Sequence, residues 1–203
     1  MQSNTQWLKD HVADEYVRRA QHEGYRARSI YKLQEIDQQY HLLKSGQTIV
    51  DLGAAPGSWC QYVVAKLGRQ CRLIALDILE MEPIHGVNFL QADFTEAEGL
   101  ERLLSALDGH PVDLVLSDMA PNISGIALSD QARSVYLMEL ALDFCEQVLR
   151  PGGTLLVKAF QGAGFPDFLK TLKQRFKTVK SRKPKASRSK SREIYLLAQG
   201  FKG

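Results

Sequence analysis

Cysteines and long hydrophobic segments are scarce in this 203-residue chain. Cys60, Cys71 and Cys145 are far apart, with no Cys-x-x-Cys pair and no His/Cys cluster, so we expect neither a disulfide framework nor a metal site. The apolar runs are short and interrupted by charges, and the first residues lack the apolar core of a signal peptide. The sequence therefore predicts a cytoplasmic protein, which we expect to be monomeric, with no membrane-spanning segment.

Acidic residues are missing from one long stretch. Eleven of the 26 Lys and Arg residues fall between Lys170 and Arg192, where no Asp or Glu occurs, although the net charge of the chain is only +3. Such a concentration of positive charge indicates a polyanionic partner. A solvated, disordered tail is the alternative. Because an apolar strand is expected at 194–198, we favour a basic loop, 177–192, that is tied at both ends.

Strand and helix patterns alternate from residue 48 onward, which predicts an α/β fold with a doubly wound, mostly parallel sheet. The last two strands are too close in sequence for a helical crossover, so the final strand should pair antiparallel to a neighbour. We expect a single domain, 1–203, in which a helical extension, 1–45, precedes the core, 46–203. In the extension, the first twenty residues have helical spacing, Gly24 ends that helix, and Ser29 caps the next one. Strands are expected at 48–51, 72–77, 87–90, 112–117, 154–159, from 179 and at 194–198, and helices at 58–67, 99–107, 129–149 and 165–176.

A turn of small residues joins the first strand to the next helix. Gly53 and Gly57 leave room for a ligand to approach the backbone, and Pro56 suits the first turn of a helix. Unpaired amides at the start of that helix would face the ligand, which is typical of a nucleotide-cofactor site. The usual dinucleotide pattern G-x-G-x-x-G is absent, and so are a Tyr-x-x-x-Lys pair and a catalytic histidine, which argues against an NAD-dependent oxidoreductase.

Aspartates follow four of the expected strands: Asp51, Asp77, Asp93 and Asp118. The carboxyl ends of parallel strands meet at one edge of the sheet, where ligands bind in α/β folds. Asp77 lies at about the distance from the turn at which such folds place the carboxylate that binds ribose hydroxyls. Each of the first three, taken alone, is equally well explained as a cap or turn residue; together they predict a ligand site.

A lysine interrupts the apolar strand expected at 154–159. An ammonium group at Lys158 needs either a partner or a function. A buried salt bridge to a strand-end carboxylate such as Asp118 is the purely structural explanation. A catalytic amine beside the ligand site is the functional one.

Several motifs in combination resemble the FtsJ/RrmJ family of bacterial ribosomal RNA 2'-O-ribose methyltransferases, and the similarity covers nearly the whole chain. The motifs are DLGAAPGSW at 51–59, SDMAPN at 117–122, PGG before a strand with VKAFQG, and RSKSREIYLLAQG at 188–200. The resemblance implies a Rossmann-like, seven-stranded methyltransferase fold with S-adenosylmethionine as cofactor. It also implies a uridine of large-subunit ribosomal RNA, in the assembled large ribosomal subunit, as substrate.

The resemblance also assigns residues. The family's Lys-Asp-Lys-Glu tetrad matches Lys32, Asp118, Lys158 and Glu193. Its cofactor contacts match Gly57, Trp59, Asp77, Asp93 and Asp118. Trp59 would otherwise be read as a packing residue.

Two basic groups lead directly into members of the tetrad and are the candidate RNA contacts, because phosphate contacts position a strand. They are Arg26 and Arg28 ahead of Lys32, and Lys183, Lys185, Arg188, Lys190 and Arg192 ahead of Glu193. Tyr31 is either a core aromatic or a residue that stacks on a base.

Methylation of a ribose hydroxyl is an in-line displacement that requires alignment and removal of one proton. Lys158, in its neutral form, is the candidate proton acceptor, and an orienting role is the alternative. Asp118 would hold Lys158, while Lys32 and Glu193 would orient the ribose. Two other functions stay open from the sequence: the same chemistry on transfer RNA or a messenger cap, and a non-catalytic RNA-binding factor in ribosome assembly.

Overall fold

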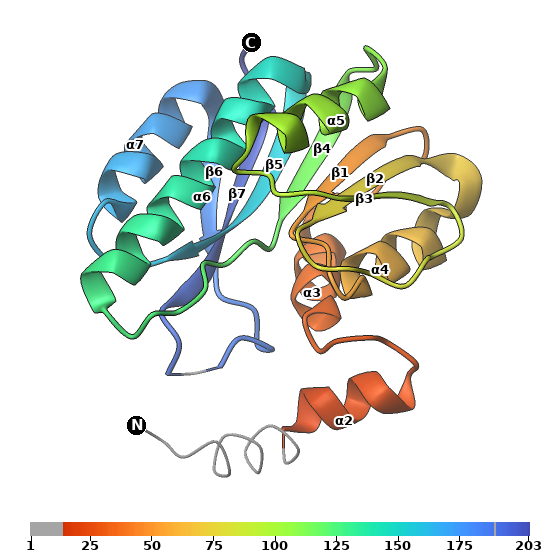
Figure 1. Ribbon diagram of the computed structural model, residues 1–203, viewed down its shortest axis with the longest axis horizontal. Coiled ribbons are helices and arrows are strands. Elements are labelled where there is room, and N and C mark those ends of the chain that lie inside the picture. Colours follow the sequence, from red (N-terminus) through yellow and green to blue (C-terminus); the bar gives the residue numbers. More distant parts are fainter. Residues whose placement is uncertain (1–13, 189) are drawn as a thin grey trace.

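A seven-stranded sheet forms the centre of the computed structural model, which describes residues 14–188 and 190–203 (Figure 1). The strand order across the sheet is β3-β2-β1-β4-β5-β7-β6. The strands are β1 (Thr48–Leu52), β2 (Arg72–Asp77), β3 (Val87–Gln91), β4 (Val112–Ser117), β5 (Leu149–Phe160), β6 (Phe176–Arg182) and β7 (Glu193–Phe201).

The directions of the strands follow the sequence prediction. Strands β1 to β5 pair in parallel, with β1 between β2 and β4. Strand β7 lies antiparallel between β5 and β6, and its register pairs Tyr195 with Lys158 and Glu193 with Phe160. The doubly wound, mostly parallel sheet with an antiparallel last strand is thus confirmed. The order places the ends of β1 and β4 side by side at the middle of the sheet.

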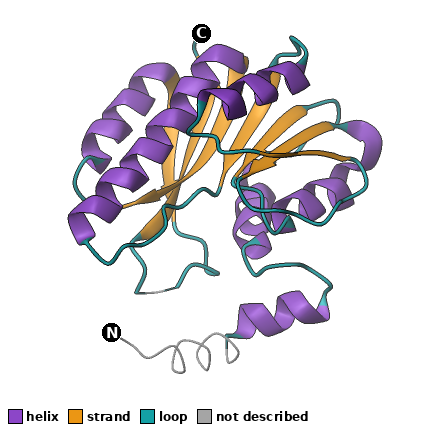
Figure 2. Cartoon of the chain, viewed as in Figure 1, coloured by secondary structure: helices purple, strands orange, loops and turns teal. Residues whose placement is uncertain are grey.

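Helices cover both faces of the sheet (Figure 2). One core lies under α5 (Ala97–Leu107), α6 (Ala127–Val148) and α7 (Phe165–Arg175). The second core lies under α3 (Ile30–Tyr40) and α4 (Ser58–Leu67). Because both faces are buried, the central strands are mainly apolar and show no regular alternation of apolar and polar residues. Among the described residues, none of the helices combines the length and the apolar character needed to cross a membrane.

The N-terminal segment differs in detail from its prediction. Helix α2 (Glu15–His22) begins where the Asp14 carboxylate accepts a hydrogen bond from the Tyr16 amide, at 3.0 Å. The rest of the first predicted helix lies outside the described residues. Ser29 occupies the N-cap position of α3, as predicted, but its hydroxyl makes no capping bond and instead shares a 2.7 Å hydrogen bond with the hydroxyl of Ser58. Ser29 therefore links the start of α3 to the start of α4.

Candidate active site

A cavity of about 380 Å³ lies at the carboxyl edge of the sheet, where the turn after β1 faces the ends of β2, β3 and β4. A cleft of this size at the point where the strand order reverses is the usual ligand site of an open α/β sheet. Three of the predicted aspartates line it: Asp77, Asp93 and Asp118. Its apolar lining comes from Leu76, Ile78, Leu79, Phe94, Met119 and Leu137.

Asp77 fixes two walls of this cavity. One of its carboxylate oxygens accepts a hydrogen bond from the Ala55 amide, and the other accepts one from the Leu79 amide, both at 2.8 Å. Asp93 holds its own loop, because its carboxylate accepts from the amide and hydroxyl of Thr95 at 2.8 and 2.7 Å. An ionised carboxylate has about four acceptor positions, so both groups keep capacity for the hydroxyls of a ligand.

The glycine turn comes unusually close to the segment after β4. Gly53 has a φ of 77° in the left-handed region, and a Cβ atom there would lie 2.9 Å from the backbone nitrogen of Met119. No side chain fits at such a distance, which explains why the turn begins with glycine. The contact presses together two segments that both line the cavity.

Gly57 and Trp59 do not line this cavity. Gly57 is closely packed, since a Cβ there would meet Met81 at 2.7 Å and Arg26 at 3.0 Å. The Trp59 side chain is buried, donates to the Ser29 carbonyl at 2.8 Å and packs against the Tyr195 ring with 5.8 Å between centroids. In the described structure Trp59 therefore supports the start of α3, which is the packing interpretation of this residue.

Asp51 does not reach the cavity either, because it points into the core with only 1% of its surface exposed. One oxygen accepts from the Cys60 thiol at 3.2 Å, and the other has no hydrogen-bond partner among the described residues. Burial raises the pKa of Asp51 to about 7. The sequence pattern alone could not separate this core aspartate from the three that face the cavity.

The raised pKa of Asp51 makes stability depend on pH. The pKa in the unfolded chain is about 3.9, so the folded state binds this proton more tightly and loses stability as the pH rises from about 4 to about 7. We expect Asp51→Asn to remove up to about 4 kcal/mol of that loss. Urea unfolding of the wild type and of Asp51→Asn, at about pH 4 and about pH 7, measures this difference in the free energy of unfolding. If the free energy of unfolding changes with pH equally in both proteins, the assignment is contradicted.

The first catalytic candidates form a tight pair. Lys158, near the end of β5, is buried, and its ammonium donates to the Asp118 backbone carbonyl at 2.6 Å and lies 3.1 Å from the Asp118 carboxylate. Asp118 sits at the end of β4, where its amide donates to the carbonyl of Leu52 at 3.0 Å. The pairing of β4 with β5 thus delivers an amine and a carboxylate to the same point at the rim of the cavity.

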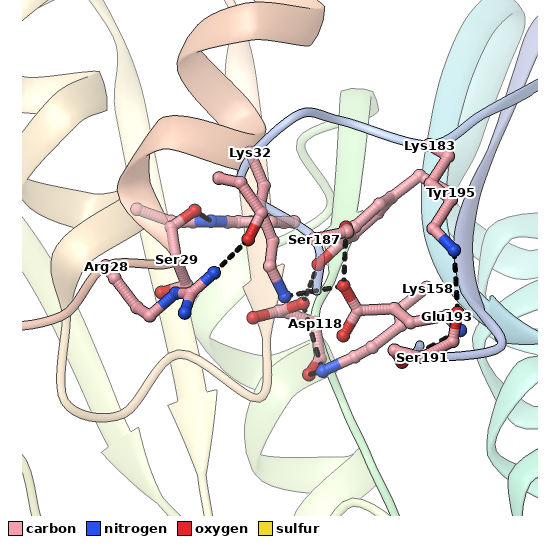
Figure 3. Close-up of polar contacts among 12 residues, drawn as sticks. Arg28, Ser29, Lys32, Asp118, Lys158, Lys183, Ser187, Ser191, Glu193 and Tyr195 are labelled. Carbon is pink, nitrogen blue, oxygen red and sulfur yellow. Dashed lines mark hydrogen bonds and ion pairs between the residues drawn. The ribbon is translucent and has the colours of Figure 1, made fainter. Parts of the chain in front are cut away.

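The other two candidates form a second pair (Figure 3). Lys32, on α3, and Glu193, at the start of β7, approach within 2.6 Å and are half-buried. Glu193 also accepts a hydrogen bond from the Ser187 hydroxyl at 2.8 Å. Two amines and two carboxylates from α3, β4, β5 and β7 therefore come together, as the sequence analysis expected; their catalytic roles stay predictions.

Tyr195 joins the two pairs and was not anticipated from the sequence. Its hydroxyl donates to the Asp118 carboxylate at 2.5 Å, and the Lys32 ammonium lies 5.7 Å from the centre of its ring. The side chain is completely buried, and burial raises its pKa well above the ordinary value, so the phenol stays protonated and keeps donating. The sequence could have pointed to Tyr195 only through its position opposite Lys158 on the neighbouring strand, and that position is known only once the register of β5 and β7 is known.

The two predicted RNA contacts that precede Lys32 bind other parts of the protein. The Arg26 guanidinium donates to the carbonyls of Pro56, Glu82 and Pro83 at 3.0, 2.7 and 3.2 Å. Arg28 pairs with Asp14 and donates to the carbonyl of Ala186. Burial lowers the pKa of Arg28 from its ordinary value. Both arginines thus organise the surface around the site in this structure.

The basic loop is anchored to the helices, and most of its charge faces solvent. Ala186 is buried against α2 and α3, and the Lys185 amide donates to the Glu35 carboxylate at 2.9 Å. The Lys183 ammonium donates to the Ser191 carbonyl at 2.7 Å. Residues 177–182 of the loop predicted at 177–192 belong to β6, so the loop is shorter than predicted. The exposed basic residues between β6 and β7 are Lys183, Lys185, Arg188, Lys190 and Arg192. Across the part of the chain that the structure describes, there is no group of three or more His, Cys, Asp or Glu that could hold a metal ion.

Comparison with known proteins agrees with this geometry. The pattern of the FtsJ-like methyltransferases matches residues 25–201. The chain belongs to the FtsJ-like methyltransferase family. The fold and the family expected from the sequence are therefore confirmed.

Relatives of known name extend this comparison to the full length. The chain is 55% identical to the ribosomal RNA large subunit methyltransferase E of Chromohalobacter salexigens, over 99% of this chain and 96% of the relative. It is 59% identical to the protein of the same name from Azoarcus sp., over 94% of this chain and 93% of the relative. A crystal structure of a ribosomal RNA methyltransferase from Plasmodium falciparum, described as putative, has a TM-score of 0.79 and 34% identity, and covers 88% of this chain and all of that one.

Proposed function

We propose that this FtsJ-like methyltransferase transfers a methyl group from S-adenosylmethionine to the 2'-hydroxyl of a ribose in large-subunit ribosomal RNA, with a uridine in the assembled subunit as target. The convergence of Lys32, Asp118, Lys158 and Glu193 beside the cavity carries this proposal. The two relatives named above, with the same name and near-complete coverage, support the RNA substrate. A cytoplasmic monomer acting on the large ribosomal subunit belongs to the same proposal.

The hydrogen-bond acceptors and apolar side chains that line the cavity suit S-adenosylmethionine. The Asp77 and Asp93 carboxylates are suited to the ribose hydroxyls and other donors of an adenosyl group. Phe94, Ile78 and Leu79 offer apolar surface to a flat base. When bound, the cofactor supplies an electrophilic methyl group on a sulfonium. Asp118 lines this cavity and also contacts Lys158, so the methyl donor and the acceptor hydroxyl would meet at Asp118.

Each residue of the cluster has a different role in the transfer. Lys158, in its neutral amine form, would take up the proton that the 2'-hydroxyl loses and so become the ammonium that Asp118 holds in place. Tyr195 holds the Asp118 carboxylate in turn. Lys32 and Glu193, locked together by their ion pair and by Ser187, orient the ribose. The cluster is therefore already arranged before RNA binds.

Methyl transfer to different RNAs tests this proposal. Radiolabelled S-adenosylmethionine is incubated with the enzyme and either large ribosomal subunits, free ribosomal RNA or transfer RNA. Label in a ribose of the large-subunit RNA is expected, and label only in transfer RNA would move the proposal to that substrate. Binding without any transfer would favour the non-catalytic assembly factor.

The exposed part of the basic loop predicts strong salt dependence of RNA binding. Lys185, Arg188, Lys190 and Arg192 each have an exposed side chain that can contact a phosphate. On single-stranded RNA each neutralised phosphate contributes about 0.7 to the slope of log affinity against log salt. We expect Lys190→Ala and Arg192→Ala to lower this slope by about that amount each. Affinity that does not respond to salt would contradict phosphate binding by the loop.

A further inference from the structure

A second cavity, of about 350 Å³, adjoins the catalytic cluster. Ala120 lines both cavities, while Asp118 and Met119 line only the first and Pro121 and Ile123 only the second. The segment that carries Asp118 therefore separates them. A ribose held by Lys158 and Asp118 would lie between the two, so the second cavity is in reach of whatever is attached to that ribose.

Phe160 gives this cavity an aromatic wall. It lies two residues after Lys158 on β5 and pairs with Glu193 of β7. The residue is half-buried, and it belongs to none of the hydrophobic cores of the described structure. A phenylalanine that packs into no core and faces a cavity beside a catalytic cluster is available for stacking.

The walls of the cavity are held in place by hydrogen bonds. The Gln131 side chain, on α6, donates to the carbonyls of Phe160 and Ala163 at 3.2 and 3.1 Å, which fixes the end of β5. The Asp130 carboxylate accepts from the Ser124 amide at 2.8 Å and the Gly125 amide at 3.1 Å, which fixes the loop carrying Ile123. The cavity is thus preformed, as small-molecule and base-binding sites commonly are.

The opening of the cavity combines apolar and basic groups. Ile123 lines the cavity and is 84% exposed, so its apolar side chain is accessible at the opening. Ser191 and Arg192, from the end of the basic loop, also line the cavity. An occupant that suits these walls has a flat, apolar face and a phosphate close by, which describes a nucleotide.

We propose that this cavity binds a nucleobase of the RNA strand whose ribose enters the catalytic cluster, with the base stacked on Phe160 and covered by Ile123. Arg192 binds a phosphate of the same strand. This inference rests on the proposed function, since it assumes an RNA substrate. It adds a base-binding site that selects the nucleotide presented to Lys158, and this site shares only Arg192 with the salt-dependent contacts of the basic loop.

Binding of a single-stranded RNA oligonucleotide that carries 2-aminopurine tests the site, because stacking quenches this fluorescent base. We expect quenching by the wild type and loss of the quench in Phe160→Ala, with affinity lower by about 5- to 150-fold, the range for one base–aromatic stack. The slope of log affinity against log salt should stay unchanged, because no phosphate contact is removed. S-adenosylmethionine affinity should also match the wild type.

Ile123→Ser and Leu128→Ser form a matched pair. Both residues are highly exposed, at 84% and 79%, so neither change should unfold the protein, and only Ile123 lines the cavity. We expect weaker RNA binding and a weaker quench in Ile123→Ser alone. Equal behaviour of the two variants, or an unchanged quench in Phe160→Ala, would overturn the proposal.

Two further outcomes are distinguishable. If Ile123→Ser and Phe160→Ala lose methylation only on whole large subunits and bind the oligonucleotide normally, the cavity takes a protein side chain and the nucleobase assignment is rejected. If the wild type binds and quenches the oligonucleotide but methylates no ribosomal RNA, the proposed reaction fails while the base site stands.

Discussion

Lys158→Ala should lower the single-turnover rate of methyl transfer by about 10²- to 10⁴-fold, the usual contribution of a positioned acid–base group. Cofactor affinity should change little, because Lys158 does not line the cavity that we propose for the cofactor. The change leaves the Asp118 carboxylate with the Tyr195 hydroxyl as its remaining side-chain partner. Rates with saturating S-adenosylmethionine and enzyme in excess over RNA measure the chemical step, and a rate close to that of the wild type would remove Lys158 from the mechanism.

Lys158→Arg separates the two roles considered for this residue. An arginine keeps the positive charge and can still donate to Asp118, but its guanidinium does not lose a proton in proteins. If Lys158 accepts the proton, the arginine variant should be about as slow as the alanine variant. If Lys158 only orients Asp118 and the ribose, the arginine variant should recover a large part of the rate.

Gly53→Ala should strongly impair both cofactor binding and stability. The methyl group would lie 2.9 Å from the Met119 backbone nitrogen, so the turn and the segment carrying Asp118 must move apart. The left-handed backbone costs about 1–2 kcal/mol for a residue with a Cβ, and forcing extra volume into a packed site costs about 1–3 kcal/mol more. Urea unfolding and calorimetric titration with S-adenosylmethionine measure the two effects.

Gly46→Ala is the control for Gly53→Ala. Gly46 has a similar φ, 84°, but a Cβ there would meet nothing within 4 Å. This variant should show the backbone penalty alone, with normal cofactor affinity. If the two alanine variants bind the cofactor equally well, the close approach at Gly53 does not shape the cavity.

The first four strands were predictable because they are short, mainly apolar runs with an aspartate near the carboxyl end. Asp77, Asp93 and Asp118 could be placed at one edge from the parallel topology alone, since the ends of parallel strands meet there. Asp51 follows the same pattern but turns into the core, because a strand position gives no information on which face is open. The helix boundaries moved by only one or two residues at α5, α6 and α7.

The residues that sequence reasoning placed least well act through contacts between distant segments. Tyr195 reads as one more apolar residue of β7, and only the register with β5 puts it beside Asp118. Arg28 reads as part of a basic RNA-binding group, and it instead holds the loop carbonyl of Ala186. Tyr31, read as either core or base-stacking, is buried and donates to Glu23 at 3.0 Å, while Phe160 faces the open cavity.

The place of β7 in the sheet constrains how the enzyme is made. Residues 193–201 are synthesised after β5 and β6, yet they occupy the interior position between them. Until they emerge, β6 has no hydrogen-bonding partner and β5 keeps an unpaired edge, a state prone to association with other chains. Because β7 also brings Glu193 and Tyr195, the candidate catalytic cluster is complete only after β7 has inserted between β5 and β6, so a nascent chain that lacks β7 has no functioning centre.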